Sequence, residues 1–315
     1  GSMVKLALIG AGNHCRGNHA PALAKYATDH PDRVALVGVC DLESEKAERF
    51  VREFGFQAAF TDYREMIEQA QPDGCVCVMP IQHIVPLAKA LMQMGMPVTV
   101  EKPPGVSIAE SRELVEVARE TGVTHMVSVN RRLQPLIQRA KQWALEEGPL
   151  RYVRASILRH NRREDSFISG TAIHCIDALR EIGGEIAGYE MFTHEGEPHW
   201  HHVVFRFASG AIGTLDILPS DGSVEERYEL FGEGYRVDAR VQTSAHPRVR
   251  CWKDNHIVVD ERPPEEEPDF VRLGPYAETH EFVCALEEGR PAWPTIEDVF
   301  PSLELAYKLD SSKPN

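Results

Sequence analysis

The stretch that decides the fold is VKLALIGAGNHC, residues 4–15, in which an apolar run ends in Gly10 and Gly12. The run predicts a buried strand, and the two glycines stand where that strand would turn into a helix. Gly10 would permit the tight turn, and Gly12 would let a pyrophosphate approach backbone amides beside Asn13 and His14. The stretch therefore predicts the dinucleotide-binding turn of a Rossmann domain, although Cys15 stands where such turns usually have a third Gly or Ala.

The pattern around this turn repeats from Val4 to about Val129. Short Val-containing apolar runs alternate with longer stretches that carry apolar residues at helical spacing, which is typical of a parallel sheet covered by helices. After Asn130 one helix is expected, and then alternating strands ending at Ser-Gly, Asp-Gly and Gly-Glu-Gly turns indicate a mostly antiparallel sheet. We expect an α/β Rossmann domain with a doubly wound parallel sheet over residues 3–128 and an α+β domain over residues 129–315.

Composition limits the partners and the compartment. With 34 Lys and Arg against 48 Asp and Glu, the net charge is −14, which disfavours a nucleic-acid partner. No apolar run approaches the roughly 20 residues of a membrane helix, so we expect no membrane partner and a cytoplasmic protein. Seven scattered cysteines indicate thiols in a reducing compartment. Neither Cys75 and Cys77 nor the histidines between 194 and 202 have the spacing of a metal site, and we expect no metal.

Asp41 indicates which dinucleotide is bound. It directly follows the second apolar run, Val34 to Cys40. A carboxylate at the end of the second strand can bind both ribose hydroxyls and repels a 2′-phosphate, which favours NAD over NADP. The alternative is a helix-capping Asp beside an ordinary glycine turn.

Further polar residues follow the next two apolar runs. Pro80 and His83 come after the third run, and Glu101-Lys102-Pro103 come after the fourth. The carboxyl ends of parallel strands form the ligand crevice of a doubly wound sheet, so we expect Lys102 beside the nicotinamide. Taken alone, Lys102 would be interpreted as a solvated lysine at a strand end.

Together these motifs resemble those of the Gfo/Idh/MocA family, the glucose-fructose oxidoreductase and inositol dehydrogenase group, over nearly the whole chain. The resemblance implies a second domain that binds substrate, with a large open antiparallel sheet whose exposed face mediates homodimers or homotetramers. The cofactor contacts that it implies are Gly10, Gly12, Asn13, His14, Asp41, Pro80, His83, Glu101, Lys102 and Asn130. The matching segments are GAGN at 10–13, Pro80 with His83, EKP at 101–103, NRR at 130–132, HCID at 174–177, ELFGEG at 229–234 and YAETHEF at 276–282.

The resemblance also implies a reaction, which is NAD-dependent hydride transfer to or from a hydroxyl-bearing carbon of a sugar, sugar acid or cyclitol. Burial beside the oxidised ring would lower the pKa of Lys102. Its amine would then accept or relay the hydroxyl proton. His174 would complete the pair from the second domain, and both would converge on one pocket. Asp177, three residues further on, could orient the imidazole and is also expected to contact substrate. The alternative for His174 is a core histidine satisfied by Asp177.

One position departs from the family pattern of Asp, three residues, then His, because Gly170 stands where that Asp is usual. Either Lys102 and His174 act alone, or Thr171, Arg162 or Arg163 substitutes at the substrate. The basic run at 159–163 could hold an anionic substrate such as a sugar acid. It is equally explained as a solvated loop partnered by Glu164 and Asp165.

Two other functions fit the same residues. Some members of the family hold NAD tightly, oxidise a sugar transiently and eliminate a glycosidic substituent, so that net redox is zero. A non-catalytic NAD-binding regulator is a third reading, which Gly170 favours and the joint presence of Lys102 and His174 opposes.

Overall fold

The computed structural model describes residues 2–241 and 244–312. These residues form two compact units. The first contains the chain up to Val129 together with Asp269–Pro301, and the second contains Asn130–Pro268 together with the residues from Ser302 onward. Among the described residues, no helix is long and apolar enough to cross a membrane.

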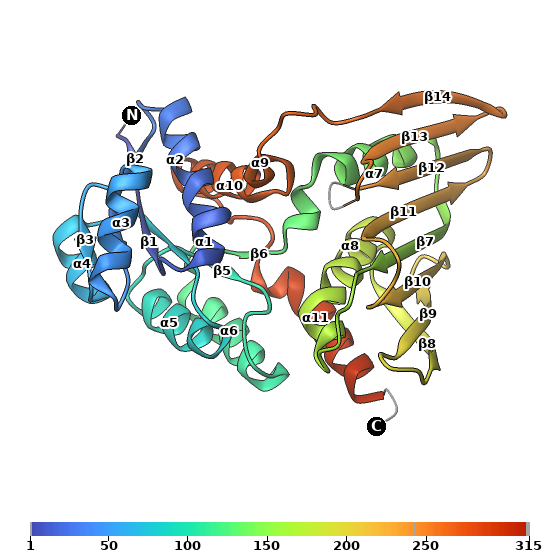
Figure 1. Ribbon diagram of the computed structural model, residues 1–315, viewed down its shortest axis with the longest axis horizontal. Coiled ribbons are helices and arrows are strands. Elements are labelled where there is room, and N and C mark those ends of the chain that lie inside the picture. The colour runs from blue at the N-terminus through green and yellow to red at the C-terminus, as the bar shows by residue number, and fades with distance from the viewer. Residues whose placement is uncertain (1, 242–243, 313–315) are drawn as a thin grey trace. The chain divides into compact units, whose positions relative to one another are not determined.

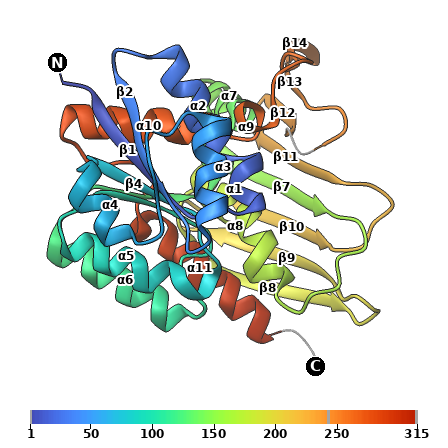
Figure 2. The ribbon, with the colours of Figure 1, turned by 60° about the vertical axis from the view of Figure 1, so that its left-hand side comes forward.

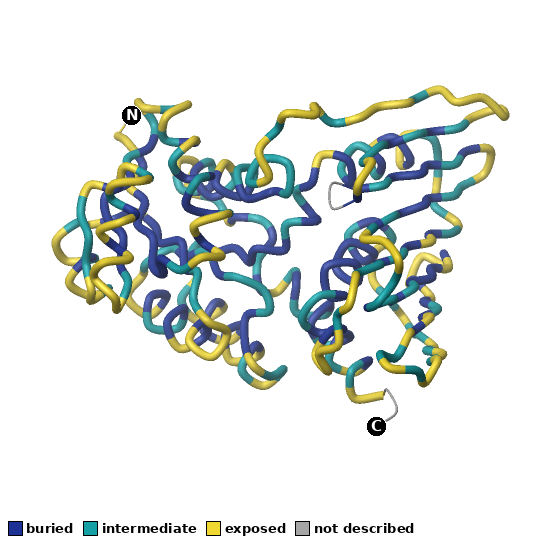
Figure 3. The backbone as a smooth tube through the Cα atoms, viewed as in Figure 1, coloured by how far each residue is buried: buried dark blue, intermediate teal, exposed yellow. Residues whose placement is uncertain are grey.

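The first unit is built on a six-stranded parallel sheet in the order β3-β2-β1-β4-β5-β6. The order reverses direction beside β1, which is where a doubly wound sheet opens its ligand crevice. Most strand residues are buried on both faces, as parallel strands require, and Figure 3 shows buried stretches in dark blue at the place of β1. The strands are β1 Val4–Ile9, β2 Val34–Cys40, β3 Ala59–Phe60, β4 Gly74–Cys77, β5 Val98–Glu101 and β6 His125–Ser128.

Helices cover both faces of this sheet. In Figure 1, α2 and α10 lie side by side on one face and α5 and α6 on the other, and Figure 2 shows the same layers from another side. Local signals set their ends: the Ser107 side chain accepts a hydrogen bond from the Glu110 amide at the start of α6, and Gly122 closes it in the left-handed conformation. The helices are α1 Asn13–Gly17, α2 His19–Asp29, α3 Ser44–Phe54, α4 Tyr63–Ala70, α5 Ile81–Gln93, α6 Ile108–Thr121, α9 Asp269–Arg272 and α10 Pro275–Glu288.

The domain boundary differs from the expectation of residues 3–128 and 129–315. The chain leaves the first unit after Val129, one residue beyond the expected boundary, and residues 269–301 return to it. A Cβ on Gly74 would lie 2.7 Å from the Phe282 ring, so α10 packs directly on a glycine of β4. The Val127 amide of β6 also donates to the Pro294 carbonyl at 2.9 Å. The first unit therefore needs this late segment to cover its sheet, and α11, Ile296–Ser312, then runs on into the second unit.

The second unit contains an eight-stranded sheet in the order β14-β13-β12-β11-β7-β10-β9-β8. Every neighbouring pair is antiparallel except β7 and β10, which confirms the expected mostly antiparallel sheet. Helices α7, Pro135–Glu147, and α8, Ile173–Gly183, cover one face, while β14 is largely exposed (Figure 3). The strands are β7 Leu150–Leu158, β8 Ile186–His194, β9 Trp200–Phe207, β10 Ile212–Leu218, β11 Glu225–Gly232, β12 Tyr235–Arg240, β13 Arg248–Lys253 and β14 His256–Glu261.

Candidate active site

The glycine turn after β1 is fixed by close contact with a neighbouring strand. Gly10 has φ +105°, and a Cβ at this position would lie 1.9 Å from the Val78 carbonyl oxygen, so no other residue fits. The Gly10 amide donates to the Cys40 carbonyl at 2.8 Å, and the Val78 amide donates to the Ile9 carbonyl at 2.8 Å. The turn is thus held between the ends of β2 and β4.

Gly12 has a different environment. A Cβ built on it meets no described atom within 4 Å, and its φ of −83° is open to any residue. The fold itself therefore leaves space at Gly12. That space is what a pyrophosphate needs to approach the backbone.

Asp41 fixes the same turn from the end of β2. Its Oδ2 accepts a hydrogen bond from the Ala11 amide at 2.9 Å, and its Oδ1 accepts from the Glu43 amide at 2.9 Å. The carboxylate consequently has a structural role in joining β2 to the glycine turn. The same carboxylate also lines a cavity at this edge of the sheet.

A cavity of about 930 Å³ opens at this edge of the sheet, within the first unit. A volume of this order holds a drug-sized ligand or half of a dinucleotide. Its walls are mainly apolar, with cationic side chains from Lys46 and Arg64. Five of the residues expected to contact cofactor line it, namely Gly10, Gly12, Asp41, Pro80 and His83.

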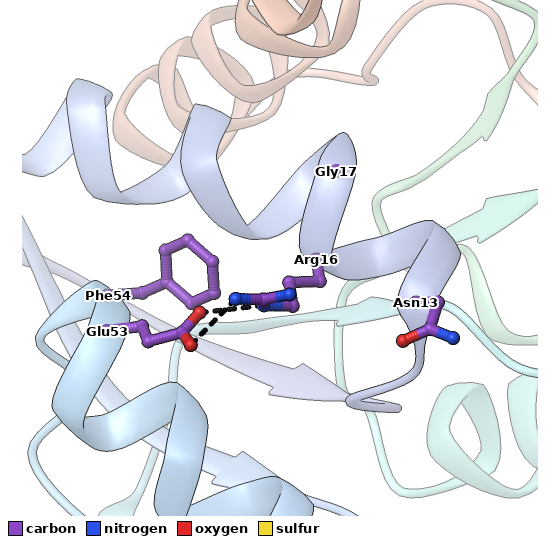
Figure 4. Close-up of a pocket in the computed structure, with 5 residues that line it drawn as sticks. All are labelled: Asn13, Arg16, Gly17, Glu53 and Phe54. Atoms are coloured by element: carbon purple, nitrogen blue, oxygen red, sulfur yellow. Dashed lines mark hydrogen bonds and ion pairs between the residues drawn. The ribbon is translucent and has the colours of Figure 1, made fainter.

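The helix expected after the turn is broken into two. α1 ends at Gly17, Asn18 adopts φ −130° and ψ −77°, and α2 begins at His19. Asn13 lines a neighbouring hollow of about 390 Å³, shown in Figure 4. There the Arg16 guanidinium donates to both oxygens of Glu53, at 2.8 and 2.9 Å. This pair ties α1 to α3.

Glu101 ends β5 among two histidines. Its Oε1 forms a hydrogen bond with His19 Nε2 and lies 3.5 Å from His14 Nε2. Burial alone would lower the pKa of His19, but the Glu101 carboxylate outweighs it and raises that pKa to about 9. Burial works to raise the pKa of Glu101, yet the two imidazoles hold it well below its usual range. The next residue, Lys102, is half-buried, and the Lys102–Pro103 peptide bond is cis.

Glu278 on α10 lies in the same buried region. Its Oε2 accepts from the Ser128 hydroxyl at 2.7 Å, at the end of β6. Burial raises the pKa of Glu278 to about 7, against the opposing effect of the His19 charge. This residue lies in YAETHEF, residues 276–282, a motif that contributes to the family resemblance but for which no role was expected.

In the second unit, His174 and Asp177 lie one turn apart on α8, and both are buried. The Asp177 carboxylate accepts from Arg132 Nε at 2.8 Å, from Arg132 Nη2 at 2.9 Å and from the Ser302 hydroxyl at 2.7 Å. We expected Asp177 to orient His174 and to reach substrate. Its side chain has no exposed surface and is ion-paired with Arg132, and this pair anchors α8 to the segment 130–133. The expected contacts of Asp177 with His174 and with substrate stay predictions.

The segment before His174 carries the other expected substrate residues. Arg162 Nη2 donates to the Thr171 hydroxyl at 3.0 Å, and Arg162 Nε donates to Glu164 at 2.6 Å. Arg163 donates to Asn161 Oδ1 at 3.0 Å. Arg162 and Arg163 also line a cavity of about 470 Å³ within the second unit.

Gly170 lies in a π-helical turn, Ile168–Ala172, directly before α8. A Cβ on it would have its nearest neighbour, Ser166 Oγ, at 4.0 Å, so the fold does not demand glycine at this position. The missing carboxylate of the family pattern is therefore a chemical difference rather than a steric necessity.

Residues 4–129 match the family described as an oxidoreductase family with an NAD-binding Rossmann fold, GFO_IDH_MocA. The chain is also 24% identical over 285 residues to scyllo-inositol 2-dehydrogenase (NADP(+)) IolU of Bacillus subtilis, an alignment covering 88% of this chain and 83% of that protein. Against myo-inositol 2-dehydrogenase of Thermotoga maritima, it is 26% identical over 235 residues, or 66% of this chain and 68% of the relative. Residues 4–129 of the chain therefore belong to the Gfo/Idh/MocA family. The chain is an oxidoreductase that uses a nicotinamide dinucleotide.

Solved structures share the whole fold of this Gfo/Idh/MocA protein. A dehydrogenase from Chromobacterium violaceum superposes with a TM-score of 0.88 at 20% identity, covering 99% of this chain and 96% of that one. Levoglucosan dehydrogenase in complex with NADH superposes with a TM-score of 0.81 at 19% identity, covering 98% of this chain and 96% of that one. The order of a Rossmann unit followed by a largely antiparallel unit is thus that of known dehydrogenases.

Not every expected cofactor residue of this Gfo/Idh/MocA chain lines the large cavity. His14, Glu101 and Lys102 belong to the neighbouring His–Glu cluster or follow it directly, and Asn130, which opens the second unit, accepts a hydrogen bond from Arg131 at 2.9 Å. His19 is absent from the sequence-based set. Its position five residues after His14 does not suggest a shared site in an unbroken helix, where residues five apart point in different directions.

Replacing Glu278 by Gln tests the buried carboxyl. As the pH rises from about 4.5 to about 7, the unfolded chain releases the Glu278 proton while the folded chain keeps it, so the wild type loses stability over this range. Glu278→Gln lacks this loss. We expect the variant to gain on the order of 2–3 kcal/mol relative to wild type between pH 5 and pH 8, seen as a rise of several degrees in the Tm difference by calorimetry. A Tm difference independent of pH would contradict this.

Proposed function

We propose that this enzyme is an NAD-dependent dehydrogenase that moves a hydride between the nicotinamide and a hydroxyl-bearing carbon of a sugar, sugar acid or cyclitol. Lys102 and His174 handle the hydroxyl proton. The observation that carries the proposal is the 930 Å³ cavity at the glycine turn, lined by both turn glycines and by Asp41. Relatives named for inositols, and others named D-glucoside 3-dehydrogenase and levoglucosan dehydrogenase, support the substrate class.

The proton chemistry rests on residue types and positions. The bound nicotinamide supplies the hydride acceptor or donor. Lys102, at the carboxyl end of β5, offers an amine that accepts the hydroxyl proton when the carbon is oxidised and returns it in the reverse direction. His174 offers the second proton-transfer group, and its helix is held in place by the Arg132–Asp177 ion pair. With glycine at position 170, these two groups do the work without the family's usual carboxylate.

The surroundings of Arg162 favour an uncharged polyol over a sugar acid. Its guanidinium is already engaged by Glu164 and by the Thr171 hydroxyl. An anionic substrate would have to compete with Glu164 for Arg162, whereas a polyol needs only hydroxyl partners. We also infer a homodimer or homotetramer formed through the open sheet face of the second unit, which carries the exposed side chains of Phe192 and Trp200.

The Lys102→Ala variant tests the assignment of the proton-transfer group. Removing the amine should lower kcat by about a hundredfold or more, because general acid–base catalysis contributes that much. NADH binding, followed by fluorescence, should persist. The matched control is Lys89→Ala, a lysine on α5 that is paired with Glu113 and lies outside the cavities described above. An unchanged kcat for Lys102→Ala would contradict the role given to this amine.

A panel of inositols, sugars and sugar acids, assayed by NADH absorbance, identifies the substrate. If aryl glycosides are cleaved and no NADH accumulates, the assigned function changes from a dehydrogenase to a redox-neutral glycosidase. A wild-type protein that turns over no compound of the panel would favour the third function, a non-catalytic dinucleotide-binding regulator.

Asp41 variants test the choice of NAD over NADP. Asp41→Asn keeps an acceptor for the Ala11 amide and removes the charge, whereas Asp41→Ser shortens the side chain as well. Both should raise the ratio of kcat/KM for NADP over that for NAD by about tenfold, since a unit charge near a 2′-phosphate is worth one to a few kcal/mol. Asp62→Asn, another carboxylate lining the cavity, is the control. An unchanged ratio in both Asp41 variants would overturn the NAD preference.

A further inference from the structure

Three side chains from separate segments of the first unit converge near the glycine turn. His14 comes from α1, His19 from the first residue of α2, and Glu101 from the end of β5. One ligand atom of each residue, an imidazole nitrogen of each histidine and a carboxylate oxygen, lies within 4.8 Å of the others. We propose that these residues bind a divalent transition-metal ion such as Zn²⁺.

The residue types suit such an ion. Two imidazoles and one carboxylate form a donor set that zinc uses with an open fourth position. Ligand atoms about 2.0–2.2 Å from a tetrahedral metal lie roughly 3.3–3.5 Å from one another, and His14 Nε2 is already 3.5 Å from Glu101 Oε1. The hydrogen bond between His19 and Glu101 opens to admit the ion. A metal then replaces the proton that the two groups share.

Burial makes two of the ligands rigid and the third accessible. The side chains of His19 and Glu101 are only 9% and 14% exposed, whereas that of His14 is 65% exposed. The buried pair therefore forms the floor of the site, and His14 closes it from the solvent side. Asn18 Nδ2 lies 3.3 Å from His14 Nδ1 and donates to the His14 carbonyl at 2.8 Å, which holds this imidazole near Glu101.

The break between α1 and α2 creates this arrangement. In a continuous helix, residues five apart lie about 140° apart around the axis, so His14 and His19 would diverge. The backbone of Asn18 interrupts the helix and directs both imidazoles toward Glu101.

The site has a consequence for the cofactor, and this part rests on the proposed function. His14 follows the turn residues Gly12 and Asn13, and Glu101 immediately precedes Lys102. A metal ion held by His14 and Glu101 would occupy space required by the dinucleotide between the glycine turn and Lys102. Metal and dinucleotide should therefore exclude each other.

Titration of the whole, chelator-treated protein with Co²⁺ and with Zn²⁺ tests the binding site. We expect one ion per chain, with the visible d–d absorption of four-coordinate Co²⁺. His14→Ala should weaken binding at least tenfold, and Glu101→Gln should do the same. His202→Asn is the matched control, because His202 is also exposed and lies 2.7 Å from a carboxylate oxygen of Asp216. His280→Ala is a second control, which tests whether the ion binds instead at His280 and the neighbouring Cys284 thiol.

The proposal fails if no saturable binding is seen, if His14→Ala binds as wild type does, or if a control variant loses the ion. A second titration separates it from the proposed function. Zn²⁺ should raise the apparent Kd for NADH of the wild type but not of His14→Ala. NADH binding without metal binding would overturn the metal site alone. Metal binding that leaves the NADH Kd unchanged would overturn the predicted exclusion and the placement of the dinucleotide beside His14.

Discussion

The close approach of Gly10 to Val78 is the constraint on which the first unit depends. Because a Cβ would fall 1.9 Å from the Val78 carbonyl oxygen, only glycine lets β1 turn beside β4. The hydrogen bonds from Gly10 to Cys40 and from Ala11 to Asp41 then fix the turn against β2. The cavity at this edge of the sheet exists because three strand ends are held in this one arrangement. The fold of the first unit and the cavity are therefore specified by the same few atoms.

Paired buried charges position the remaining functional segments. Arg132 holds Asp177 on α8, and Arg131 donates to Glu226 on β11. A buried charge without its partner is costly, so each pair permits a single arrangement of the elements that carry it. The His19–Glu101 pair does the same for the end of β5, which precedes Lys102. These ion-paired side chains position the neighbouring segments, and none of them is assigned to proton transfer.

The sequence patterns predicted the parallel sheet well because its strands are continuous apolar runs, such as Val4–Ile9 and Val34–Cys40. They missed β3, which has two residues, and β12 to β14, in which Arg236, Asp238 and Arg248 interrupt the apolar pattern. These charges are paired across strands, as between Arg227 and Asp238, and such pairing cannot be seen in one segment. Long-range packing, as of Phe282 on Gly74, was likewise invisible. For the same reason the ion pair between Arg132 and Asp177 was not predicted.

The central claim is that the space beside Gly12 belongs to a dinucleotide. Isothermal titration of NADH into a Gly12→Val variant tests it most directly, because the described part of the fold places no atom within 4 Å of the new Cβ. We expect a folded protein with unchanged Tm and NADH affinity reduced by at least a hundredfold, since the side chain would block the approach of the pyrophosphate to the backbone. A folded Gly12→Val variant that binds NADH as tightly as wild type would contradict it.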